Sequence, residues 1–276
     1  MDTVTPRITP CELRATLGTG AWPLVVDVRR RAAFESDSGL VAGATWRDPF
    51  QVADWEKYLP RHRPVVIYCV HGHEISGNAA AALRQAGVDA RYLEGGIEAW
   101  RSLGGPTVAR LEDPAIPSTP GKPSVWVTRE RPKIDRVACP WLVRRFVDPL
   151  AHFVFVQASQ VVSRAAELGG TAFDVPGVRF THRGERCSFD AFIEDFGLVD
   201  EGLHGLATIV RGADTGRPDL APECAGLQAV SAGMGANIQD DLVLLERAFP
   251  VYDALYAACR DGAAKRTAHL AGSVGA

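Results

Sequence analysis

Short apolar runs alternate with helical segments between residues 8 and 104, and this alternation limits the fold more than any other feature. Each apolar run has the length of a strand, and the segments between them have helical spacing. Strands joined through helices form parallel sheets. We therefore predict an α/β domain over residues 1–104, a parallel sheet flanked by helices, with strands at 23–28, 44–47, 64–69 and 90–93 and helices near 51–59, 75–86 and 96–103.

A change in composition follows this domain. The stretch 104–123 contains five prolines and three glycines and has no hydrophobic period, so 105–123 is predicted to be a linker. Apolar residues then recur mostly at helical spacing, and only VWVT and FVFV are typical of strands. We predict a mainly α domain with a few strands at 124–262 and a flexible tail at 263–276.

The overall charge excludes some partners. The 276 residues include 30 basic and 33 acidic side chains, a formal charge of -3 that favours a small-molecule partner and no nucleic acid. No apolar run is long enough to cross a bilayer, so we expect no membrane partner. The first ten residues have neither the basic start nor the apolar stretch of a secretory signal, and we expect a cytoplasmic protein.

A cysteine stands at the end of the apolar run PVVIY. Cys69 is followed by a polar loop and then by a helical segment. Ligands of open parallel sheets bind beyond the carboxyl ends of the strands, which predicts an exposed thiol there. The helix N-terminus would favour the thiolate, and Gly72 would let the loop amides surround an anion. The alternative is a small buried residue of the core.

Several segments between residues 8 and 104 resemble the single-domain rhodaneses. They are DVR at 27–29, the Gly-Ala pair at 43–44, VVIYCVHG at 65–72 and YLEGGIEAW at 92–100. The resemblance implies a sulfurtransferase without a required cofactor. Cys69 would take sulfane sulfur from thiosulfate or a small persulfide donor and pass it to a thiol or protein acceptor. The active-site loop would comprise Val70, His71, Gly72, His73 and Glu74.

The resemblance also assigns neighbours of this loop. Asp27 and Arg29 match positions beside the active site, where they pair structurally or orient substrate; a solvated pair at the strand end is the alternative. Glu74 stands where many thiosulfate-using members have a cationic or hydroxyl side chain, so we expect weak activity on thiosulfate. A tyrosine-phosphatase-like loop would close with arginine, whereas residue 75 is isoleucine.

The second domain resembles the C-terminal domain of the chromate-resistance (ChrB-type) proteins. The matching segments are 126–156, 180–198 and the stretch from IVRGADTGRPDL to FPVYDALYAACR. This resemblance implies a role in chromate or oxyanion resistance without assigning a reaction to residues. Two functions stay open: a sulfurtransferase linked to that resistance, or a non-catalytic thiol sensor of oxyanions or redox state that regulates it.

Five residues of the second domain have the chemistry of metal ligands. Asp135 and Cys139 are four positions apart, on one helical face, and His182 and Cys187 lie in a polar segment. Together with Asp214 they could form a zinc or iron site if the fold brings them together. Structural roles for these residues are the alternative, since the sequence has no recognised metal-binding spacing.

Overall fold

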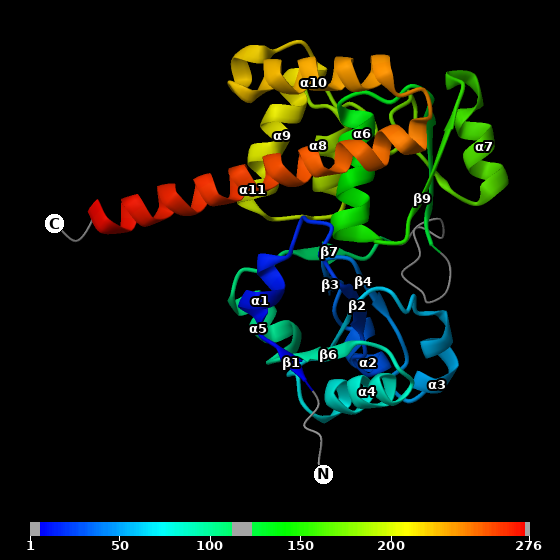
Figure 1. Cartoon of the computed structure of the whole chain (residues 1–276), viewed down its shortest axis with the longest axis vertical. Helices are drawn as coiled ribbons and strands as arrows, with labels where there is room; N and C mark the ends of the chain where they lie inside the picture. Colours follow the sequence, from blue (N-terminus) through cyan, green and yellow to red (C-terminus); the bar gives the residue numbers. More distant parts are fainter. Residues whose placement is uncertain (1–5, 112–122, 274–276) are drawn as a thin grey trace. The chain divides into compact units, whose positions relative to one another are not determined.

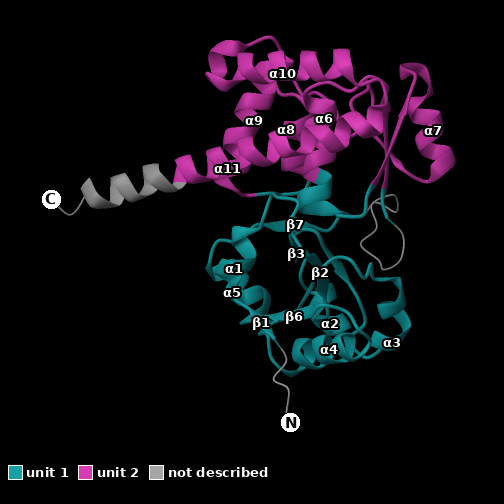
Figure 2. Cartoon of the chain, viewed as in Figure 1, with its two compact units in different colours: residues 1–124, 143–151, 196–198 teal, residues 125–142, 152–195, 199–276 magenta. Residues whose placement is uncertain are grey.

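The computed structural model describes residues 6–111 and 123–273, with side chains described up to residue 263. The chain divides into two compact units (Figure 2). Unit 1 comprises residues 1–124, 143–151 and 196–198, and unit 2 comprises 125–142, 152–195 and 199–276. The predicted boundary lies near residue 124. Two short segments beyond it, 143–151 and 196–198, nevertheless group with unit 1.

Unit 1 has the strand and helix alternation that the sequence predicts (Figure 1). Thr9 caps the first helix, since its hydroxyl accepts from the Glu12 amide while the Glu12 carboxylate accepts from the Thr9 amide. The elements of its main segment are β1 (Arg7–Ile8), α1 (Pro10–Ala15), β2 (Leu24–Asp27), α2 (Arg31–Glu35), β3 (Gly39–Val41), β4 (Ala44–Trp46), α3 (Val52–Trp55), η1 (Glu56–Tyr58), β5 (Val65–Tyr68), α4 (Glu74–Gln85), β6 (Ala90–Leu93), α5 (Gly96–Ser102) and β7 (Thr107–Ala109).

Five of these strands form one parallel sheet in the order β1-β6-β5-β2-β4. Alternate residues of a strand face opposite sides, and Val65, Ile67 and Cys69 lie in one apolar cluster with residues of α3 and α4. The intervening Tyr68 is also buried, and its hydroxyl accepts from the amide of Val41. This alternation directs Cys69 to the side of the sheet that α4 covers.

Two parts of unit 1 differ from the sequence prediction. Strand β7 pairs antiparallel with β3, so residues 107–109 belong to a small sheet and not to a linker. The remainder of the predicted linker, residues 112–122, lies outside the described residues. The single helix expected at 51–59 is divided into α3 and η1.

Unit 2 is mainly helical with one small parallel sheet, β10-β8-β9. The described elements beyond residue 124 are β8 (Val125–Arg129), α6 (Asp135–Leu142), the π-helical η2 (Val143–Val147, part of unit 1), β9 (His152–Val156), η3 (Ala158–Gln160), α7 (Val161–Leu168), β10 (Thr171–Ala172), α8 (Ser188–Asp195), α9 (Glu201–Asp214), η4 (Pro218–Leu220), α10 (Glu223–Asn237) and α11 (Asp241–Ser273). The fold class is the predicted one, a parallel α/β unit and a mostly helical second unit with a few strands.

The end of the chain corrects one prediction. Helix α11 continues to Ser273, so residues 263–273 of the expected flexible tail have helical backbone. Small and polar residues such as those of this segment do not prevent a helix, because alanine has the highest helix propensity. Within the residues that the structure describes, we find no helix whose length and apolar character would allow it to span a membrane.

Candidate functional site

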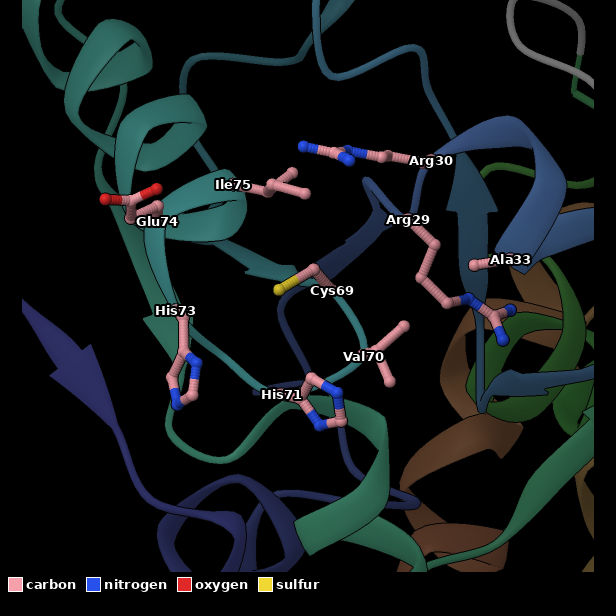
Figure 3. A pocket seen from close by; sticks show the side chains of 9 residues that line it. All are labelled: Arg29, Arg30, Ala33, Cys69, Val70, His71, His73, Glu74 and Ile75. Atoms are coloured by element: carbon pink, nitrogen blue, oxygen red, sulfur yellow. The ribbon is translucent and has the colours of Figure 1, made fainter.

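Cys69 directly follows β5, at the edge of the sheet where the parallel strands β2 and β5 end. It lines a pocket of about 600 Å³ (Figure 3). The lining residues are Arg29, Arg30, Ala33, Cys69, Val70, His71, His73, Glu74 and Ile75. Cys69 is only 6% exposed, so the expected exposure of the thiol is wrong, and burial of this residue follows the alternative. The residue packs into the apolar cluster beneath α4 and still borders the pocket.

The loop after Cys69 is held by close backbone contacts with the Gly95-Gly96 turn. Gly72 has a φ of +67°, and a Cβ atom there would lie 2.4 Å from the carbonyl oxygen of Leu93. A Cβ atom on Gly96, whose φ is +59°, would lie 2.4 Å from the carbonyl oxygen of Cys69. Only glycine permits both the left-handed conformation and this approach. The two glycines therefore fix the loop against the start of α5.

The hydrogen bonds of this turn leave the loop amides available. The amides of Ile97 and Glu98 donate to the carbonyl oxygens of Cys69 and Val70, at 3.0 and 3.3 Å. Among the residues that the structure describes, the N–H groups of 70–76 donate to no protein acceptor. Successive free amides at the start of a helix are a site for an anion. The arrangement suits a thiolate or persulfide bound within the loop.

The loop side chains surround the pocket entrance. Figure 3 shows the sulfur of Cys69 directed toward the part of the loop that carries His73 and Glu74. His71 and His73 are exposed, their ring centroids are 5.9 Å apart, and Nδ1 of His71 lies 2.9 Å from a carboxylate oxygen of Glu98. Glu74 is exposed at the first position of α4. His71, His73 and Glu74 thus line the same pocket as the thiol.

Asp27 and Arg29 form a buried ion pair, so the alternative of a solvated pair is wrong. The Arg29 guanidinium donates to both carboxylate oxygens of Asp27, with a shortest separation of 2.6 Å. It also donates to Asp37 at 2.7 Å and to the carbonyl oxygen of Gly39 at 3.0 Å. Through these contacts Arg29 links the end of β2 to Asp37 and to Gly39, the first residue of β3. Arg29 therefore has a structural role.

Sequence reasoning missed two residues beside Cys69. Ser76 is buried in the first turn of α4, and its hydroxyl oxygen lies 3.3 Å from the Cys69 sulfur. Arg30 is exposed, lines the pocket and has no ion-pair partner among the described residues (Figure 3). A signal for Arg30 was present, because β2 ends three residues before it and the ends of parallel strands meet at one edge.

A second group of polar residues lies in unit 2. Nε2 of His182 is 3.1 Å from Asp135, 3.4 Å from Asp214 and 3.5 Å from Asp174. Burial raises the pKa of Asp214 to about 7, and the negative charge of Asp135 adds to this effect. The hydrogen bond with Asp135 raises the pKa of His182. The fold thus brings together three of the five residues that the sequence offered as metal ligands, and it adds Asp174.

The other two candidates, Cys139 and Cys187, are fully buried. Burial raises the pKa of both thiols well above the ordinary value, which favours the protonated form. Neither thiol belongs to the group formed by Asp135, His182 and Asp214, whose ligand atoms lie within 4.8 Å of one another in the described part of the chain. The structure therefore assigns Cys139 and Cys187 to packing, as the alternative for these residues predicted.

Family models match both parts of the chain. Residues 9–103 match the rhodanese-like domain, and residues 126–259 match the C-terminal domain of ChrB. The chain belongs to the rhodanese family and carries a ChrB C-terminal domain. The predicted resemblance is thus confirmed for both parts. The loop with Cys69 lies in the rhodanese-like domain, and the group around His182 lies in the ChrB C-terminal domain.

Each individual relative matches one of the two domains. The rhodanese-like domain is 34% identical over 97 residues to thiosulfate sulfurtransferase GlpE of Pseudomonas aeruginosa, a match that covers 35% of this chain and 84% of that protein. The protein ChrB of Cupriavidus metallidurans is 39% identical over 132 residues, which are 48% of this chain. The match spans only 39% of the length of that ChrB protein.

Solved structures of rhodanese-like proteins also match. A rhodanese-related protein from Thermoplasma volcanium is 25% identical, with a TM-score of 0.33, and the match covers 38% of this chain and 99% of that one.

Proposed function

We propose that the rhodanese-like domain is a sulfurtransferase in which Cys69 is the nucleophile. The observation on which this rests is the position of the thiol: it borders a pocket of about 600 Å³ at the base of a loop whose amides have no protein acceptor. Similarity to the thiosulfate sulfurtransferases GlpE supports the same reaction class. The free amides would stabilise the negative charge that the terminal sulfur carries after transfer.

The proposed reaction has two displacements. The Cys69 thiolate attacks the terminal sulfur of thiosulfate, a new S–S bond forms, the S–S bond of the donor breaks, and sulfite leaves with the electron pair. With a persulfide donor the leaving group is a thiolate. An acceptor thiolate or cyanide then attacks the outer sulfur of the Cys69 persulfide. That S–S bond breaks, and the Cys69 thiolate is restored without a net oxidant or cofactor.

Arg30 supplies a permanent positive charge to the pocket. Its guanidinium lines the pocket and has no ion-pair partner in the described part of the chain, so it is free to attract an anionic donor. Glu74 lines the same pocket and opposes this attraction. We therefore expect measurable but weak activity with thiosulfate and better use of a small persulfide, which carries less charge.

A wider role follows from the second domain. We propose that sulfur transfer is linked to resistance against chromate or related oxyanions, on the basis of the ChrB C-terminal domain. We also propose a cytoplasmic location. The six cysteines form no disulfide in the described part of the chain, as expected in a reducing compartment.

Intact-protein mass spectrometry after incubation with thiosulfate or a low-molecular-weight persulfide tests the proposal. We expect one added sulfur atom on the wild type, its loss when a thiol acceptor is added, and many cycles of both. Cys69→Ser should gain none. Cys11→Ser is the matched control, because Cys11 is an exposed thiol of the same domain that does not line the pocket. A single modification that no acceptor discharges would instead favour the thiol sensor.

The role of Arg30 has its own test. Arg30→Gln should raise KM for thiosulfate about tenfold, since a hydrogen bond to a charged group contributes on the order of 1.5 kcal/mol. The KM of Arg30→Gln for a neutral sulfur donor should differ little from that of the wild type. Arg31→Gln is the control, because Arg31 is exposed, adjacent in sequence and absent from the pocket lining. Equal KM values for the two variants would contradict the role of Arg30.

A further inference from the structure

Three segments of the ChrB C-terminal domain bring four polar side chains to one point. Asp135 is the first residue of α6, Asp214 is the last residue of α9, and Asp174 and His182 lie in the segment between β10 and α8. The backbone fixes this segment, since the amide of Asp174 donates to the carbonyl oxygen of Phe180 at 2.8 Å. Phe173 and Phe180 are both buried against Trp126. The aromatic core therefore positions Asp174 and His182.

The spacing of the ligand atoms is that of a coordination sphere. Nε2 of His182 lies 3.1, 3.5 and 3.4 Å from carboxylate oxygens of Asp135, Asp174 and Asp214. Ligands bonded at about 2.1 Å to one ion are about 3.0 Å apart in an octahedral site and about 3.4 Å apart in a tetrahedral site. The separations to Asp135 and Asp214 fall in this range, and the separation to Asp174 is slightly longer.

Hydrogen bonding alone does not account for the arrangement. A protonated Nε2 has a single N–H and can donate it to one carboxylate at a time, whereas three carboxylates surround it. In addition, the ligand oxygens of Asp135 and Asp214 lie within 4.8 Å of each other and of Nε2 of His182. Two carboxylates at this separation repel each other, and a cation bound between them would remove the repulsion.

The three aspartates differ in their burial and in the groups with which they pair. The carboxylate of Asp174 is buried and already pairs with two guanidinium groups, Arg129 at 2.6 Å and Arg136 at 3.3 Å. Asp135 is also buried, but no arginine lies within ion-pair distance of it in the described chain, and its carboxylate faces His182 and Asp214. The side chain of His182 is 42% exposed, which gives an ion a route from solvent to the buried carboxylates.

We propose that Asp135, His182 and Asp214 bind one divalent first-row transition metal ion, with Asp174 oriented beside it by Arg129 and Arg136. Carboxylate oxygens and an imidazole nitrogen suit Mn²⁺, Fe²⁺ or Zn²⁺. Three protein ligands leave further coordination positions for water or an anion. The site is independent of sulfur transfer, because Cys69 lies in the other domain.

Full-length protein, stripped with chelator and then titrated with Mn²⁺ or Zn²⁺ alone, tests the site by calorimetry and elemental analysis. We expect close to one equivalent bound and a higher Tm with metal. His182→Ala and Asp214→Asn should weaken binding at least about a hundredfold, since removing even an outer partner of a ligand costs ten- to a hundredfold. His204→Ala is the matched control: His204 is an exposed histidine of the same domain outside the group.

Two results would overturn the site: less than about a tenth of an equivalent bound by wild type at saturating metal, or equal affinity of the His182→Ala and His204→Ala variants. The wild-type stoichiometry decides the matter even if a variant fails to fold, which circular dichroism reports. Cys69→Ser should bind metal like the wild type, so the sulfurtransferase proposal and the metal site are tested separately.

Discussion

The sulfur of Cys69 and the hydroxyl oxygen of Ser76 lie 3.3 Å apart, and both residues are buried. Ser76 is in the first turn of α4, seven positions after the cysteine, and its hydroxyl donates to the carbonyl oxygen of His73 at 3.2 Å. A hydroxyl has one proton, so donation to the Cys69 thiolate would replace the bond to His73. Such a charge-assisted bond favours the ionised nucleophile.

Ser76→Ala should therefore slow persulfide formation at Cys69 about tenfold, the equivalent of one hydrogen bond to a charged group. Time-resolved mass spectrometry with a persulfide donor measures the rate. Ser163→Ala is the matched control, because the Ser163 hydroxyl also donates to a carbonyl oxygen three residues earlier, at 3.1 Å, but in the other domain. An unchanged rate in Ser76→Ala would show that the hydroxyl does not assist the thiol.

Gly96→Ala should destabilise the rhodanese-like domain by about 3 kcal/mol or more, because the new Cβ would meet the carbonyl oxygens of Cys69 and Val70. Gly87→Ala isolates the conformational part of this cost. Gly87 also has a positive φ, +81°, but a Cβ there meets nothing within 4 Å. It should cost only about 1 kcal/mol. Denaturant unfolding followed by circular dichroism compares them, and similar losses would contradict the proposed close packing.

Asp27→Asn should cost about 3 to 5 kcal/mol of unfolding free energy, because it leaves the buried Arg29 guanidinium without its main partner. An exposed ion pair of the same domain provides the comparison. Arg31 and Glu35 lie 3.4 Å apart with side chains 67% and 59% exposed, so Glu35→Gln should cost less than about 0.5 kcal/mol. If both substitutions have the same small effect, the buried pair does not stabilise the fold.

Asp37 predicts a pH dependence of stability. Burial would raise its pKa, but hydrogen bonds from Arg101 and the Gly39 amide outweigh this and lower the pKa of Asp37 from 3.8 to about 2. A carboxylate with a lowered pKa in the folded state stabilises the fold above its unfolded pKa. That contribution is lost as the pH falls from about 4 through about 2.

Asp37→Asn should therefore lose about 2 kcal/mol of unfolding free energy at pH 7, and the difference from wild type should shrink toward zero near pH 2. Unfolding by urea across this pH range measures both quantities. Asp54→Asn serves as the control, since Asp54 is exposed and should change stability by less than about 0.5 kcal/mol at any pH. A pH-independent loss in Asp37→Asn would exclude the electrostatic cause.

The local part of the candidate site was predictable from sequence. Cys69 follows an apolar run and precedes a helical segment, and parallel strands place such residues at the ligand-binding edge of the sheet. Its burial was not predictable, because it depends on which face of β5 is covered. Val65, Ile67 and Cys69 face α4 together, so the thiol shares the apolar core. Cys11, by contrast, is exposed in α1.

The contribution of the sequence alone was the order of strands and helices, the loop that begins at Cys69, and a set of residue types able to bind metal. These features depend on neighbours a few positions apart, which sequence periodicity records. Only the tertiary structure decided that His182 meets Asp135, 47 positions away, while Cys139 and Cys187 are buried outside this group of ligand atoms. Contacts between distant segments are set by the packing of whole helices and strands, and no local pattern specifies them.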